Sequence, residues 1–115
     1  MRTNLVPEDP LSEVAFVHDY VQVAFQDARF SLYNTLRLIL GPIAFTQGEV
    51  EFPGHLVGLI GHRVLSASSS ENAFLQLHFE GGAELQVLRA GRFRRGPEAY
   101  QFNGLQGLIV VEQNE

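Results

Sequence analysis

Residues 20–40, YVQVAFQDARFSLYNTLRLIL, alternate apolar and polar side chains on both sides of an Asp-Ala pair. Alternation with a period of two places every second side chain on the same face of a β-strand, so this stretch predicts a β-hairpin with one buried face. If residues 27–28 form a two-residue loop, Phe25 lies opposite Phe30 and the apolar side chains share that face. We expect the second strand to continue through Leu38 until a Gly-Pro pair stops it.

Residues 74–89, FLQLHFEGGAELQVLR, predict a second hairpin. A two-residue Gly-Gly turn would put Phe79 opposite a glutamate and mix apolar and charged side chains on one face. A three-residue loop at Gly81 to Ala83 pairs Phe79 with Leu85 and keeps that face apolar, so we expect this longer loop. The neighbours of Phe79 on either side then lie on the opposite, wetter face.

Residues 52–64, FPGHLVGLIGHRV, break the alternation. Leu56, Leu59 and Ile60 share one arc of a helical wheel, which predicts a short helix packed on the sheet through these three side chains. The segment has glycines inside the predicted helix, so packing rather than intrinsic propensity must stabilise it.

The whole pattern predicts an α+β fold. We expect a mostly antiparallel β-sheet of about six strands, curled into a roll or half-sandwich, with one short packed helix. The length of 115 residues suits a single domain over residues 1–115, with a flexible N-terminus at residues 1–12. Apolar residues make up 45% of the chain and charged residues 18%, which provides enough apolar surface for a packed core.

The composition excludes several classes of site. The chain has no cysteine, so disulfides, cysteine-zinc sites and thiol nucleophiles are excluded. No segment has the length and hydropathy of a membrane span or the pattern of a secretion signal, and we expect a cytoplasmic protein with no membrane association. Acidic residues outnumber basic residues by 13 to 8, which argues against nucleic acid as the partner because such binding uses a broad basic surface.

Four of the eight basic residues lie in RAGRFRRGPEAY, residues 89–100. Arginine and aromatic side chains are enriched at protein interfaces, so this loop predicts a docking site for an acidic protein surface. Two other interpretations remain open: a solvated loop whose arginines pair with a local glutamate, and a site for phosphate or nucleic acid, since guanidinium groups bind phosphate through paired hydrogen bonds. The candidate partner-binding residues are Arg92, Phe93, Arg94, Arg95 and Glu98.

The histidines support an alternative hypothesis. A sheet face lined by histidine and glutamate suits a small-ligand-binding protein or an enzyme. The candidate residues for such a site are His18, His62, His78 and Glu80. His55 and His62 lie about 10 Å apart along the predicted helix, which is too far for one metal ion. We therefore expect no metal and no cofactor, and we assign no catalytic residue.

The segments LVGLIGHRV, LQLHFEGGAELQV and RRGPEAYQF follow one another along the chain and precede the apolar end LIVVE. In this succession the chain resembles small uncharacterised bacterial proteins of about its own length, over roughly residues 18–112. Some proteins of that kind occur as immunity-type or partner proteins beside toxins. The resemblance implies a fold more than an activity and carries over no active-site residues.

The function that we expect is that of a protein-binding module rather than an enzyme. Its most concrete form is an immunity-type inhibitor of a toxin or of another enzyme, with a protein partner that presents an acidic surface. The apolar run Leu108–Val111 predicts either a central strand flanked on both sides or an edge strand that a second copy covers. The second case predicts a homodimer.

Overall fold

The computed structural model describes residues 5–105 and 107–114. Within these ranges the chain forms ten β-strands, one α-helix and one short 3-10 helix. The strands are β1 Leu11–Val17, β2 Tyr20–Phe25, β3 Ala28–Leu32, β4 Leu36–Leu40, β5 Ile43–Thr46, β6 Val64–Ser68, β7 Ala73–Phe79, β8 Glu84–Leu88, β9 Glu98–Gly104 and β10 Ile109–Gln113. The α-helix is α1 Phe52–Val57 and the 3-10 helix is η1 Gly91–Phe93.

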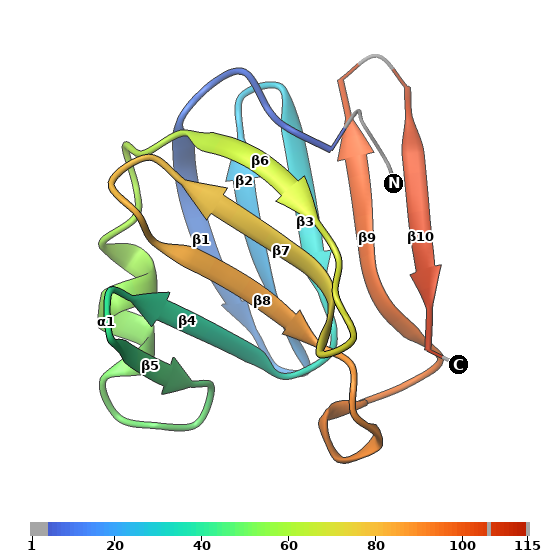
Figure 1. Ribbon diagram of the computed structural model, residues 1–115. Coiled ribbons are helices and arrows are strands. Elements are labelled where there is room, and N and C mark those ends of the chain that lie inside the picture. Colours follow the sequence, from blue (N-terminus) through green and yellow to red (C-terminus); the bar gives the residue numbers. More distant parts are fainter. Residues whose placement is uncertain (1–4, 106, 115) are drawn as a thin grey trace.

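The strands form two antiparallel sheets that pack face to face (Figure 1). The first sheet has the order β1-β2-β3-β9-β10 and the second has the order β5-β4-β8-β7-β6. The strands of the second sheet cross those of the first obliquely, and α1 lies at one side, in contact with β1 and β4. No helix in the described ranges is long and apolar enough to span a membrane.

The core fills the space between the two sheets. Alternate side chains of each strand point inward and join one continuous apolar cluster. Its largest fully buried members are Tyr100, Phe30, Phe52 and Phe79. Burying a large apolar side chain stabilises a fold by about 1.5–3 kcal/mol, so this cluster is the main favourable term in folding.

The mostly antiparallel architecture with one short α-helix is confirmed within the described ranges, but the expected number of about six strands is too low. One reason is the segment predicted as a single strand through Leu38. The chain leaves the first sheet after Leu32 and enters the second sheet at Leu36, while the alternation of apolar side chains continues without a change of parity. A second reason is β1, an edge strand in which only Leu11 is buried, so its sequence shows no clear alternation.

The first predicted hairpin forms from β2 and β3 with the expected face and a shifted register. Phe25 and Phe30 are both buried, but Phe30 lies opposite Val23 instead of Phe25. The paired residues end at Ala24 and Arg29, so four residues form the connection instead of two. A shift of two residues keeps each side chain on its face, which is why alternation predicts the face and leaves the pairing partner open.

The second hairpin, β7 and β8, shows the same kind of shift. Leu85 lies opposite Leu77 and not opposite Phe79, although Phe79 is buried on the expected face. The backbone N–H of Phe79 donates to the carbonyl of Ala83 at 2.8 Å, so the three-residue loop covers residues 80–82. Both glycines of this loop have positive φ, 87° and 98°, a conformation that glycine adopts without strain, and they place the turn there.

Helix α1 is shorter than the pattern predicts and ends at Val57. Leu56 and Leu59 are buried as expected, whereas Ile60 is 43% exposed, so the prediction that Ile60 packs on the sheet is wrong. The reason lies at Gly61, where a φ of 98° turns the chain away and the backbone N–H donates to the carbonyl of Leu11 at 2.8 Å.

The expected flexible N-terminus falls partly on residues 1–4, which lie outside the described residues. In the part that follows, Leu5 and Leu11 are buried in the core. The backbone N–H of Glu8 donates to the carboxylate of Asp27 at 2.7 Å, which holds this segment to the turn between β2 and β3.

The two connections between the sheets meet at one place, which we call the Asn34 corner: Asn34, Leu88 and Asn114. The Asn34 side chain is 1% exposed, and its Nδ2 donates to the Leu88 carbonyl at 2.9 Å and to Asn114 Oδ1 at 2.7 Å. Asn114 Nδ2 donates back to Asn34 Oδ1 at 2.9 Å. The corner therefore joins the end of β8 and the chain after β10 to the residue at which the chain passes from β3 to β4.

Replacing Asn34 by alanine removes these hydrogen bonds and leaves the Leu88 carbonyl without its Asn34 donor in a buried place, while Asn114 Nδ2 keeps its hydrogen bond to the Gly96 carbonyl. We expect Asn34→Ala to lower the free energy of unfolding by about 2–3 kcal/mol, measured by urea denaturation. Asn103→Ala is the control, because Asn103 is exposed, and it should change stability by less than about 0.5 kcal/mol. Equal midpoints for the two variants would contradict this role of Asn34.

Candidate functional site

The arginine-rich loop connects β8 to β9 and projects from one end of the sandwich (Figure 1). Its backbone is held at both ends of η1. The N–H of Arg89 donates to the Asn72 carbonyl at 3.0 Å, and the N–H of Thr35 donates to the Phe93 carbonyl at 2.9 Å. The loop is thus attached to the turn between β6 and β7 and to the crossing between the sheets.

The side chains of two of the arginines, Arg89 and Arg94, are each held by a hydrogen bond to the backbone carbonyl of another residue. The Arg89 guanidinium lies 4.1 Å from the centre of the Phe74 ring, and its Nε donates to the Ser70 carbonyl at 3.0 Å. Arg94 Nε donates to the Arg89 carbonyl at 3.1 Å. Among the described residues, no acceptor takes a hydrogen bond from the Nη atoms of Arg89 or Arg94. Both side chains are therefore fixed at Nε and still have their terminal donors available.

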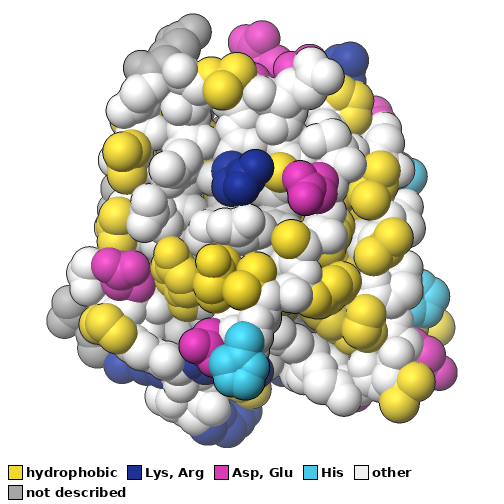
Figure 2. All heavy atoms as spheres, turned by 180° about the vertical axis from the view of Figure 1, so that it is seen from behind, with side chains coloured by type: hydrophobic (Ala, Val, Ile, Leu, Met, Phe, Trp, Pro, Cys, Tyr) yellow, Lys and Arg dark blue, Asp and Glu magenta, His cyan; other side chains and the backbone are white. Residues whose placement is uncertain are grey.

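These side chains line a hollow of about 320 Å³, which we call the arginine hollow. Its charged lining consists of Arg37, Arg89, Arg92, Arg94 and Glu71, and Phe93 contributes an aromatic wall. No ion pair joins any of these arginines to a carboxylate in the described part of the chain. In Figure 2 the basic side chains gather at the lower edge of the molecule, where the loop projects. The hollow is a concentrated positive site on a chain of net charge −5.

Three charged residues of this lining, Arg37, Arg89 and Glu71, were not among the residues predicted for partner binding, although Arg89 lies in the predicted loop. The alternation in β4 places Arg37 opposite to the buried Leu36 and Leu38, so its outward direction could be inferred. Its position beside the loop depends on the pairing of β4 with β8, which the sequence pattern does not show. Glu71 lines the hollow from the turn between β6 and β7, and its position there also depends on the strand order, which the sequence pattern does not show.

Of the residues predicted for partner binding, Arg92, Phe93 and Arg94 line the hollow, whereas Arg95 and Glu98 are not among its lining residues. Arg92 extends over the ring of its neighbour Phe93, with 4.5 Å between the guanidinium carbon and the ring centre. Arg95 is exposed, and its Nη2 lies 3.4 Å from Thr35 Oγ1. Glu98 begins β9, and within the described residues it forms no ion pair with an arginine. The interpretation of a loop neutralised by its local glutamate therefore has no contact to support it.

The structure does not bring the predicted histidine site together. His18 lies in the turn between β1 and β2, with a 95% exposed side chain 3.4 Å from Asp19. His62 Nδ1 lies 3.3 Å from the Glu80 carbonyl.

His78 lies on β7, and its side chain is 39% exposed. Its Nδ1 lies 3.5 Å from Glu84 Oε1, and Glu84 Oε2 accepts hydrogen bonds from Gln76 at 2.6 Å and from Gln86 at 2.8 Å. No group of three or more metal-ligating side chains occurs among the residues that the structure describes.

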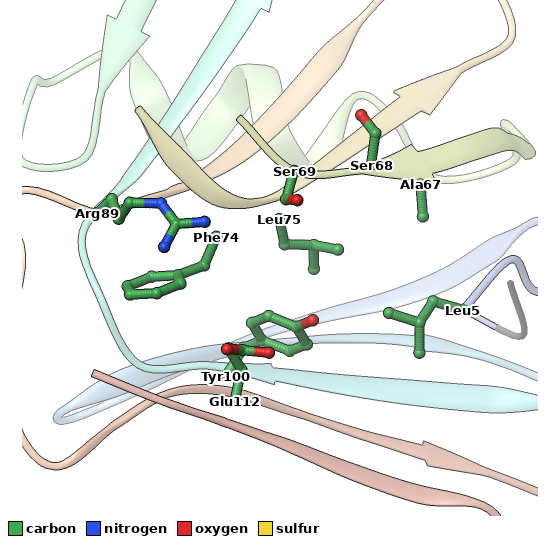
Figure 3. Close-up of a pocket in the computed structure, with 9 residues that line it drawn as sticks. All are labelled: Leu5, Ala67, Ser68, Ser69, Phe74, Leu75, Arg89, Tyr100 and Glu112. Atoms are coloured by element: carbon green, nitrogen blue, oxygen red, sulfur yellow. The ribbon is translucent and has the colours of Figure 1, made fainter. Parts of the chain in front are cut away.

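A second cavity, of about 200 Å³, opens between the two sheets (Figure 3). Phe74, Leu75 and Arg89 come from the side of the second sheet, and Tyr100 and Glu112 approach from the first. Ligand pockets for small molecules usually have volumes of about 300–1,000 Å³, so this cavity is small for such a ligand. The arginine hollow is the stronger candidate site.

No protein-family model matches the chain, and no curated protein and no solved structure shows significant similarity to it.

The contacts of Arg89 and Arg37 differ, and this predicts different stabilities for their variants. Arg89→Met keeps an apolar side chain over Phe74 and loses both the hydrogen bond to Ser70 and the cation–π contact. We expect a loss of about 1–2 kcal/mol in the free energy of unfolding. Arg37→Met should stay within about 0.5 kcal/mol of the wild type, because the Arg37 side chain forms no hydrogen bond within the described residues. Urea denaturation measures both, and equal losses would show that Arg89 does not anchor the loop.

Proposed function

We propose that the chain is a protein-binding module and that the arginine hollow holds an acidic segment of its partner. The observation that carries this proposal is the convergence of four arginines from two separate parts of the chain, β4 and the connection after β8, on one hollow. These are half of the eight basic residues in an acidic chain. Like charges brought together in this way repel one another, so an anionic partner would be attracted strongly.

The chemistry of the hollow favours carboxylate groups. A guanidinium group binds a carboxylate through two parallel hydrogen bonds, which gives both strength and direction. Arg89 and Arg94 are already oriented by hydrogen bonds from Nε to backbone carbonyls. Little side-chain freedom is then lost when a partner binds, and this raises the affinity.

The shape and surroundings favour a protein segment. The hollow also contains the apolar side chains of Leu88, Ala90 and Phe93, which suit an acidic residue with an apolar neighbour. Nucleic acid is the less favoured partner, because its binding needs basic surface well beyond one hollow and the chain carries a net charge of −5.

The most concrete form of this function is inhibition of a toxin or of another enzyme. The loop projects from the end of the sandwich (Figure 1), which allows it to enter a cleft on a partner. The backbone hydrogen bonds that hold η1 to Thr35 and Asn72 preserve its shape as it docks. Inhibitors that are already ordered in this way associate with little backbone change.

Photo-crosslinking from position 93 tests the proposal directly. A benzophenone-bearing phenylalanine replaces Phe93, the protein is irradiated in its native host, and the crosslinked segments are identified by mass spectrometry. We expect protein segments rich in aspartate and glutamate. Adding Arg92→Glu and Arg94→Glu should lower the yield at least tenfold, since an arginine at the centre of an interface is worth about 2 kcal/mol or more.

Arg63→Glu is the matched control, because Arg63 is an exposed arginine outside the hollow. When it is added to the protein with the photo-crosslinking residue at position 93, the crosslinking yield should equal that of the protein with the replacement at position 93 alone. Crosslinks to neutral or basic segments, crosslinks to nucleic acid, an equal yield from the double variant, or no crosslink at all would each contradict the proposal.

A further inference from the structure

The outer face of the first sheet carries three rows of side chains that run across its strands. The first row is Glu13, Ala24, Arg29, Asn103 and Ile109, and the second is Ala15, Gln22, Ser31, Gln101 and Val111. The third begins with Val17, Tyr20 and Tyr33, whose two tyrosine rings lie 5.3 Å apart. Figure 2 looks onto this face, which is mostly uncharged, with a basic and an acidic side chain close to its middle.

We propose that this face binds a second copy of the chain. The charge distribution is the first argument. The residues named in the three rows include one acidic residue, Glu13, and one basic residue, Arg29, so their charges cancel although the chain has a net charge of −5.

The positions of the two charges are the second argument. Glu13 and Arg29 flank Ala24 on its two sides, one strand away in each direction. In an interface that uses the same patch on both copies, a two-fold axis relates the two copies. If this axis runs parallel to β2 and passes between the copies at Ala24, β1 of each copy lies over β3 of the other. This arrangement brings Arg29 of each copy opposite Glu13 of the other, which forms two equivalent ion pairs.

The same axis pairs the third row in a complementary way. Tyr33 of each copy comes to lie over Val17 of the other, and Tyr20 faces its own counterpart. Val17 is a valine with 42% of its side chain exposed, which this arrangement would cover. Tyrosine is among the residues enriched at protein interfaces, because it offers apolar area together with a polar group.

The polar groups of the face are the third argument. Gln22 donates to Ser31 Oγ at 3.3 Å and accepts from Arg29 at 3.4 Å. Covering a polar group costs stability when it loses water and gains no partner. These groups already have partners within the face, so a second copy can cover them at a small cost. The arginine hollow has no lining residue on this face and stays open.

A charge exchange between Glu13 and Arg29 tests the arrangement by sedimentation velocity over micromolar to sub-millimolar concentrations. We expect the wild type to dimerise. Arg29→Glu and Glu13→Arg should each weaken dimerisation at least tenfold, because each places like charges opposite each other. An equimolar mixture of the two variants should form a heterodimer, since every opposed pair is then of opposite charge. The combined variant, with both changes in one chain, should dimerise again and so shows that the changes preserve the fold.

Arg63→Glu is the control and should dimerise as the wild type does. A wild type that stays monomeric throughout the range would overturn the proposal. So would single variants that dimerise normally, because the dimer would then form elsewhere, for example along the exposed edge strand β10, where Ile109 is 59% exposed. A mixture that remains monomeric would show that Glu13 and Arg29 do not face each other.

Discussion

Reciprocal hydrogen bonds join the side-chain amides of Asn34 and Asn114 where both connections between the two sheets pass. The apolar core holds the sheets together, and these hydrogen bonds fix the connections. Asn34 binds the Leu88 carbonyl at the point where β8 ends, and Asn114 binds the Gly96 carbonyl just before β9 begins. The bond from the buried Asn34 to Leu88 avoids the cost of an unpaired amide, which makes the arrangement more selective than apolar packing alone.

The arginine hollow follows from this corner. The loop that carries the arginines starts and ends at residues that the corner holds, so their backbone has little freedom. Thr35, next to Asn34, binds the Phe93 carbonyl, and the Asn114 backbone binds the Pro97 carbonyl. A loop with four arginines would otherwise spread to separate its charges. Holding it closed keeps the guanidinium groups together, and the net negative charge of the remaining chain makes this the place where an acidic partner is attracted.

The alternation of apolar residues predicted the buried face of each hairpin, the antiparallel architecture and the short helix. It did not predict the pairing partners, because a shift of two residues changes no side chain's face. It also did not predict the division into two sheets. The one sign of this division is Asn34, a polar residue at a position where the alternation of Phe30, Leu32 and Leu36 predicts an apolar side chain. The arginine loop could be predicted as a candidate site from composition. Arg37 could not, since its place beside the loop depends on strand order.

Native-state amide hydrogen exchange measures whether the Asn34 corner holds the two sheets and the arginine loop together. The Asn114 N–H comes directly after β10 and donates to the Pro97 carbonyl at 2.8 Å. We expect this N–H to exchange slowly, with an opening free energy equal to that of the Thr35 amide. Both values should fall together in Asn34→Ala. Exchange at Asn114 at the rate of an unstructured peptide, while Thr35 stays protected, would contradict the claim that one corner holds the sheets and the loop together.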